Sequence, residues 1–284
     1  MCFPLPCVSV YNFIKRYGRI TDMSTIGFIG CGNMGSALAM AVYRSNQAEQ
    51  IFLSNRTKEK AVALAEKTGG TVTDNLGVCE KADIIFLGVK PQMLSDVVKE
   101  IKEPLQKRKH RYVLVSLLAG KDIKTLEDNF GRVPIIRCAP NIPAQIGSGI
   151  TLFSANQYIS EAEKEYFKKL MLPSGYVEEV DEHTMECANG IMGCGPAFAA
   201  MFVEALSDGG VACGLRRDKA LLYAAEMMKG TAEMLLQTNM HPAQLKDSVC
   251  SPGGSTIQGV RKLEENNFRA ALIDAVIATF EKKF

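Results

Sequence analysis

Residues Thr25-Ile26-Gly27-Phe28-Ile29-Gly30-Cys31-Gly32-Asn33-Met34-Gly35 decide the fold of the N-terminal half. The apolar run 25–29 predicts a buried strand, and the alanine-rich run 36–44 predicts a helix. Between them lies the spacing G-x-G-x-x-G. In dinucleotide-binding folds the first glycine makes the turn, the second lets the pyrophosphate approach, and the third allows close packing of helix on strand. This position between strand and helix predicts a dinucleotide site at Gly30–Gly35.

Apolar and helical segments continue to alternate as far as residue 180. The predicted strands are 51–53, 71–72, 83–87, 112–117, 133–138, 150–153 and 177–180. Strands and helices at this spacing predict an α/β fold, a Rossmann-like doubly wound sheet. We expect 150–153 to form an edge strand.

The second predicted strand ends in Ser54-Asn55-Arg56, a segment without a carboxylate. An NAD site usually places Asp or Glu here, to accept from the adenine ribose hydroxyls. A guanidinium instead offers a planar fork of donors that suits a 2′-phosphate. The sequence therefore predicts NADPH as cofactor, with NADH possible. Val89-Lys90-Pro91 and Ala119-Gly120 end two later strands, where such a cofactor lies; Lys90 fits a cofactor contact and a solvated helix residue equally well.

Strand signals end near residue 180, and helical patterns fill the rest of the chain. We expect a poorly packed extension at 1–22, with Met23 a plausible start, an NADP-binding Rossmann domain at 23–180, and a helical substrate and dimerisation domain at 181–284. About a hundred residues this rich in Leu, Met, Ala and Val cannot all be buried alone. The helices therefore predict a homo-oligomer.

A second glycine-rich turn, Val249-Cys250-Ser251-Pro252-Gly253-Gly254-Ser255-Thr256, precedes the amphipathic run 257–265. We expect Ser251 to cap this helix and Pro252 to occupy its first position, with glycines that bare the backbone N–H groups. Such a turn attracts an anion, because free amides and the helix dipole point the same way. A well-capped surface helix is the alternative. His241 is expected to cap a helix rather than to act in catalysis.

Composition excludes several other classes. Of 284 residues, 47% are hydrophobic and 23% charged, and the net charge is +2, which favours a globular protein without a nucleic-acid or membrane partner. Nine cysteines without C-x-x-C spacing and three histidines predict no metal site. Unpatterned cysteines indicate reduced thiols and a cytoplasmic protein. We expect no apolar run long enough to cross a membrane.

With these motifs together, the chain resembles the pyrroline-5-carboxylate reductase family from about Ser24 to its C-terminus. Beside the first glycine-rich turn, the resemblance rests on Val89-Lys90-Pro91, Arg137-Cys138-Ala139-Pro140-Asn141-Ile142-Pro143, Gly193-Cys194-Gly195-Pro196-Ala197, Asp208-Gly209-Gly210-Val211, and His241-Pro242-Ala243-Gln244-Leu245-Lys246-Asp247 leading into Ser251–Thr256.

The resemblance implies reduction of L-1-pyrroline-5-carboxylate to L-proline by hydride transfer from NADPH. It also implies a helical domain that interlocks with a second subunit, often in larger rings of dimers. The cofactor residues it implies are Gly30, Gly32, Asn33, Met34, Gly35, Ser54, Asn55, Arg56, Asn75, Val89, Lys90, Pro91, Ala119 and Gly120. For the imine acid it implies Val249, Ser251, Pro252, Gly253, Gly254, Ser255 and Thr256, with the Thr256 hydroxyl next to the imine nitrogen as the catalytic group. We add Asn141, the amide of the stiff turn 139–143.

The chain departs from the family pattern at three positions. Met192 and Cys194 stand where the family usually has serine, and Phe198 where it has tyrosine, so reduction of a related cyclic imine remains an alternative. A hydroxy-acid reductase would need a catalytic lysine on a helix of the second domain, and residues 181–214 contain none. A non-catalytic NADPH-binding regulator is opposed by the intact turn 251–256, although Met192 and Cys194 leave it open.

Overall fold

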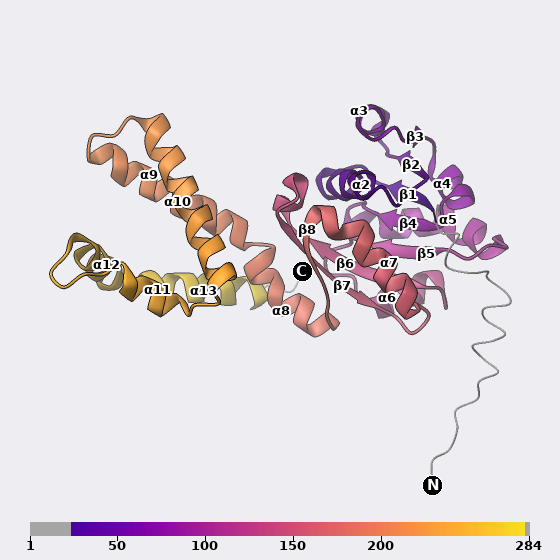
Figure 1. Ribbon diagram of the computed structural model, residues 1–284. Coiled ribbons are helices and arrows are strands. Elements are labelled where there is room, and N and C mark those ends of the chain that lie inside the picture. The colour runs from indigo at the N-terminus through magenta and orange to yellow at the C-terminus, as the bar shows by residue number, and fades with distance from the viewer. Residues whose placement is uncertain (1–23, 282–284) are drawn as a thin grey trace, which may run out of the picture. The chain divides into compact units, whose positions relative to one another are not determined.

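The computed structural model describes residues 24–281 (Figure 1). The expectations for residues 1–22 and for a start at Met23 lie outside this range. The chain divides into two compact units, one ending at Ala188 and the other beginning at Asn189.

The first unit is built on one eight-stranded sheet with strand order β3-β2-β1-β4-β5-β6-β7-β8. The strands are β1 Thr25–Ile29, β2 Gln50–Ser54, β3 Thr71–Val72, β4 Ile84–Leu87, β5 Val113–Ser116, β6 Ile135–Pro140, β7 Gly149–Ala155 and β8 Gly175–Glu179. Neighbouring strands are parallel except β6 and β7. The order runs outward from β1 in both directions, which confirms the doubly wound fold and puts its switch point between β1 and β4.

One strand lies elsewhere than predicted. β7, expected at the edge, pairs with β6 on one side and β8 on the other, and β8 forms the edge. Phe153 of β7 is fully buried, as an inner strand requires. The sequence of β7 looks the same in either position, because the alternation within a strand does not report how many neighbours it has.

Helices cover both faces of the sheet. They are α2 Asn33–Ser45, α3 Lys58–Thr68, α4 Asn75–Lys81, α5 Leu94–Lys107, α6 Ile123–Phe130 and α7 Glu161–Met171, with 3₁₀ turns η2 Pro91–Met93, η3 Ile142–Ile146 and η4 Leu172–Ser174. Side chains of α2, α3 and α7 join one core with Phe28, whereas α4, α5 and α6 join a second core with Ile29. Because successive strand residues face opposite sides, both faces of the sheet are apolar.

An aromatic chain runs through the first core. The rings of Phe28 and Phe86 stack with centroids 4.5 Å apart, and Phe167 of α7 meets Phe153 edge-on at 4.9 Å. A capping box opens α7, since the Ser160 hydroxyl accepts from the amide of Glu163 and the Ser160 amide donates to the Glu163 carboxylate.

The second unit is helical. Its helices are α9 Gly195–Ala212, α10 Arg217–Thr238, α11 Pro242–Ser248, α12 Ser255–Glu265 and α13 Phe268–Glu281, while α8 Glu182–Met192 crosses the division between the units. The first turns of α8 are held to the sheet, because buried Arg137 of β6 donates to Glu182 at 2.8 Å. The last strand, β8, ends at Glu179, and the division between the two units follows at Ala188.

The helices of the second unit expose many apolar side chains. Among them are Met201, Leu206, Leu221, Leu222, Tyr223, Met227, Leu236, Ile273, Ile277 and Phe280. The helical stretch Glu182–Ala212 is even long and apolar enough to cross a membrane by length and composition, so the expectation that no run would reach that length is wrong. A helix that packs on another subunit passes the same test, so this is weak evidence for a membrane span.

Candidate functional site

The first glycine-rich turn connects the carboxyl end of β1 to α2. Gly30 has φ 103°, which an L side chain rarely adopts, and its amide donates to the carbonyl of Ser54 at 2.8 Å. A methyl group on Gly30 would lie 2.6 Å from the carbonyl carbon of Gly88. Glycine is therefore required here, where the ends of β1, β2 and β4 meet.

The other two glycines of the turn have different surroundings. A methyl group on Gly32 would meet no atom within 4 Å, whereas one on Gly35 would lie 2.1 Å from the carbonyl oxygen of Gly30. Gly32 is the N-cap of α2 and no side chain caps this end, so the first amides of the helix have no intrahelical partner. The open space and the free donors fit a dinucleotide pyrophosphate.

Polar side chains gather at the neighbouring strand end. The amide of Cys31 donates to Oδ1 of Asn55 at 2.9 Å, and the hydroxyl of Ser54 donates to Oδ1 of Asn75 at 2.6 Å. Arg56 is exposed and makes no hydrogen bond or ion pair within residues 24–281. Three of the predicted cofactor residues thus contact the turn or each other, and the Arg56 guanidinium is available for an anion.

The remaining cofactor candidates follow β4 and β5 along the same edge of the sheet. Lys90 is exposed, and Pro91 opens η2. Ala119 and Gly120 are exposed, and Gly120 has φ 69°. The amide of Leu117 donates to the carbonyl of Leu87 at 3.1 Å, which ties the two loops together. All the predicted cofactor segments therefore lie at the carboxyl edge of the parallel strands, where such sheets bind ligands.

Cys31 in the middle of the turn is not a reactive thiol. It is buried, and burial raises its pKa to about 11. Its Sγ lies 3.5 Å from the carbonyl oxygen of Ser54, to which it donates. A thiol held protonated in this way helps to pack the turn and is no nucleophile.

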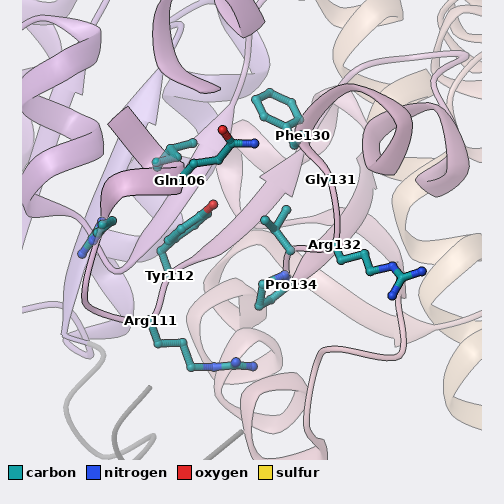
Figure 2. Close-up of a pocket in the computed structure, with 10 residues that line it drawn as sticks. Gln106, Arg111, Tyr112, Phe130, Gly131, Arg132 and Pro134 are labelled. Carbon is teal, nitrogen blue, oxygen red and sulfur yellow. The ribbon is translucent and has the colours of Figure 1, made fainter. Parts of the chain in front are cut away.

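A cavity of about 230 Å³ lies at the amino ends of the strands, opposite the glycine-rich turn, where β5 and β6 begin (Figure 2). It is lined by Leu105, Gln106, Arg108, Arg111, Tyr112, Phe130, Gly131, Arg132, Val133 and Pro134. The Arg111 and Arg132 side chains extend away from the Tyr112 ring (Figure 2), and Glu163 holds the Arg111 guanidinium at 2.6 Å. The predicted cofactor residues lie at the carboxyl ends, so this cavity is separate from the first glycine-rich turn.

The second glycine-rich turn differs from its prediction. Helix α12 begins at Ser255 with Gly254 as its N-cap, so the expected capping by Ser251 and the first position for Pro252 are wrong. The amide of Gly254 donates to the carbonyl of Ser251 at 3.1 Å, and Gly253 has φ 70°. Proline second and a positive-φ glycine third are the signature of a type II turn, which places the helix start after the glycines.

This shift moves the free donors along the chain. The amides without an intrahelical partner are those of Ser255, Thr256 and Ile257, since the amide of Gly254 is bonded within the turn. Thr256 is exposed, and its hydroxyl makes no hydrogen bond within the described residues. The turn still combines three free amides and a free hydroxyl, a donor set that suits a small carboxylate.

Two other predicted residues have structural partners. His241 caps α11, as predicted, because its Nδ1 accepts from the amide of Ala243 at 3.2 Å. Asn141 is buried, and its Oδ1 accepts from the amide of Ile150 at 2.8 Å. Asn141 belongs to the first unit and the turn 251–256 to the second, so a shared role in substrate binding stays a prediction.

Comparison with known proteins agrees with this arrangement. The family description pyrroline-5-carboxylate reductase dimerisation matches residues 182–283, and the description NADP oxidoreductase coenzyme F420-dependent matches residues 25–120. The pyrroline-5-carboxylate reductase of Escherichia coli is 38% identical over 261 residues, which cover 90% of this chain and 96% of that protein. The chain belongs to the pyrroline-5-carboxylate reductase family. The Pisum sativum member is 36% identical over 266 residues, covering 93% of this chain and 96% of its own length.

Solved structures of pyrroline-5-carboxylate reductases share the fold over nearly the whole chain. The Plasmodium falciparum enzyme, crystallised with NADP bound, gives a TM-score of 0.82 at 31% identity and covers 93% of this chain and 98% of its own. The Coxiella burnetii enzyme gives a TM-score of 0.83 at 31% identity, with 92% and 98% covered. The match of 182–283 to a dimerisation family also accounts for the apolar surface of the second unit.

Proposed function

We propose that the chain is a pyrroline-5-carboxylate reductase that reduces L-1-pyrroline-5-carboxylate to L-proline with NADPH, the last step of proline biosynthesis. The observation that carries the proposal is that this family member keeps an open, uncapped helix start at Gly32 and a second one after Gly254. Both are anion sites made of backbone donors, as a phosphorylated cofactor and a carboxylate substrate require.

The cofactor residues divide into three groups. The amides at the start of α2 hold the pyrophosphate next to Gly32. Arg56, with Ser54 and Asn55 beside it, binds the 2′-phosphate through its free guanidinium. Val89, Lys90 and Pro91, together with Ala119 and Gly120, line the path along the strand ends. The cofactor supplies a hydride to the C=N carbon when bound.

The substrate residues bind and orient. The amides of Ser255, Thr256 and Ile257 donate to the carboxylate of the imine acid at the positive end of α12. The Thr256 hydroxyl hydrogen-bonds the ring nitrogen. An imine of this kind is partly protonated near neutrality, so the site needs no His or carboxylate as general acid. Orientation of the imine carbon is then the main catalytic task of these residues.

The protein is also proposed to be a homo-oligomer in the cytoplasm. A second copy of the chain is the partner for the exposed apolar helices of the second unit, in a homodimer or a larger ring of dimers. The seven cysteines within residues 24–281 are all unpaired, which suits a reducing compartment such as the cytoplasm.

The test is oxidation of NADPH by the full chain with L-1-pyrroline-5-carboxylate, repeated with NADH and with the six-membered cyclic imine. Turnover of the six-membered imine alone would favour the related-imine activity that Met192 and Cys194 suggest. NADPH binding without any turnover would favour a non-catalytic regulator.

Thr256→Ala tests the catalytic hydroxyl. We expect turnover to fall by about 10²-fold, as for loss of one positioned donor, while the Kd for NADPH stays near the native value. Thr256→Ser keeps the hydroxyl and should restore most of the activity. Unchanged turnover in Thr256→Ala would remove this residue from the site.

A further inference from the structure

The side-chain amide of Asn75 is held from both sides. Its Oδ1 accepts from the Ser54 hydroxyl at 2.6 Å, and its Nδ2 donates to Oε2 of Glu100 at 2.7 Å. Ser54 ends β2, Asn75 opens α4, and Glu100 lies on α5. The three residues thus form a relay that runs from the ribose end of the predicted cofactor site to a carboxylate on another element.

The end of β2 is where dinucleotide folds recognise the adenine ribose. NAD sites place a carboxylate there, and this chain has none in Ser54-Asn55-Arg56. The relay connects this strand end, through Asn75, to a carboxylate on α5. Glu100 forms no ion pair within residues 24–281, whereas Glu103, one turn further along α5, is paired with Lys107. The charge behind Asn75 is therefore not neutralised.

The carboxylate also sets the direction of the relay. An ionised carboxylate can only accept, so Asn75 must turn its NH₂ group toward Glu100 and its oxygen toward Ser54. The Ser54 proton is then committed to Asn75, and the hydroxyl oxygen can only accept from a ligand. An acceptor suits a ribose 2′-hydroxyl, which donates, and opposes a 2′-phosphate, which also accepts.

We propose that Glu100 is a positioning residue that limits the preference for NADPH over NADH. It acts through Asn75, by fixing the orientation of the Asn75 amide so that the relay presents an acceptor to the ribose. Arg56 attracts the 2′-phosphate, and Glu100 keeps NADH usable beside it. The inference deepens the proposed function and rests on its cofactor site.

The test measures dissociation constants of NADPH and NADH on the full chain by titration calorimetry, without substrate. In Glu100→Gln the ratio Kd(NADH)/Kd(NADPH) should rise by about three- to tenfold, the size expected for one hydrogen bond, because a glutamine lets the Asn75 amide turn over and the Ser54 hydroxyl donate to the 2′-phosphate. Glu103→Gln removes a charge from the same helix but touches no cofactor residue, and its ratio should equal that of the wild type.

A second background shows whether the effect passes through Asn75. When Asn75→Ala is already present, adding Glu100→Gln should change the ratio by less than twofold, because the relay is gone. An unchanged ratio in Glu100→Gln, an equal rise in Glu103→Gln, or a full effect in the Asn75→Ala background would each overturn the inference. Cofactor binding with no reduction of pyrroline-5-carboxylate would refute the proposed function alone, because the binding ratio is still measured.

Discussion

Two alanine substitutions in the first glycine-rich turn should separate cofactor binding from folding. Gly32 has φ −77°, which alanine adopts freely, and its methyl group would meet no atom within 4 Å. We expect Gly32→Ala to change the free energy of unfolding by less than about 1 kcal/mol, since the loss at the N-cap is offset by reduced entropy of the unfolded chain.

Gly35→Ala meets a different environment. The added methyl group would lie 2.1 Å from the carbonyl oxygen of Gly30, and both atoms belong to rigid elements. Separating them to van der Waals contact requires α2 or β1 to move by about 1 Å, and overpacking of this kind costs roughly 1–3 kcal/mol. At about 2–4 °C per kcal/mol for a domain of this size, the Tm should fall by roughly 2–12 °C.

For cofactor affinity we expect the reverse: Gly32→Ala, which leaves the stability nearly unchanged, should weaken NADPH binding. The Gly32→Ala methyl group occupies the open space that lets the pyrophosphate approach the helix amides, so the Kd for NADPH should rise at least about tenfold while the Tm is retained. Thermal unfolding without cofactor and calorimetric titration with NADPH measure the two effects separately. Native NADPH affinity in Gly32→Ala, or equal losses of Tm in both variants, would refute the assignment of roles to the two glycines.

Three further changes test other parts of the structure. Burial raises the pKa of Glu163, but hydrogen bonds from Arg111 and Ser160 outweigh it and leave the pKa below its ordinary value; its stabilisation should thus be present above pH ~4.3 and lost as pH falls. Glu163→Gln should lower the free energy of unfolding, measured in urea at pH 7, by roughly 3 kcal/mol. The difference in this free energy between wild type and variant should become smaller toward pH 3. Arg56→Ala should weaken NADPH by about tenfold and leave NADH unchanged in the same titrations, and equal losses for both would contradict a phosphate contact. Iodoacetamide at pH 8 should spare three buried thiols in the folded protein, as judged by peptide mass spectrometry, and label them in urea; they are Cys31, Cys79 and Cys138, whose pKa values burial raises.

Local patterns predicted the sheet unit well. The strands Thr25–Ile29 and Thr71–Val72 have the predicted bounds, and both ends of every other strand agree to within two residues. This follows because an apolar run covered on both faces and a glycine turn are each set within a few neighbouring residues. The place of β7 inside the sheet was missed, since it depends on where β8 returns after α7.

The start of α12 shows a conflict between two local rules. Ser251-Pro252 fits an N-cap followed by a first-position proline, and Pro252-Gly253 fits the centre of a type II turn. The positive φ of Gly253 decides for the turn. Both interpretations leave free amides at a helix start, so the anion site stays a prediction, now with Ser255, Thr256 and Ile257 as its donors.

Glu100 could not be found from the sequence, and the reason is physical. On the amphipathic helix Leu94–Lys107 it is one of several exposed charges, and nothing in its neighbours distinguishes it from Glu103. Only the packing of α4 against α5 brings it within 2.7 Å of Asn75. The two glycine-rich turns can be predicted locally, because their donors are backbone amides of neighbouring residues. The choice between NADPH and NADH, which differ by one phosphate, depends instead on the Glu100 side chain of the distant helix α5. Cofactor preference in this chain should therefore change through substitutions on α5 that leave both glycine-rich turns untouched.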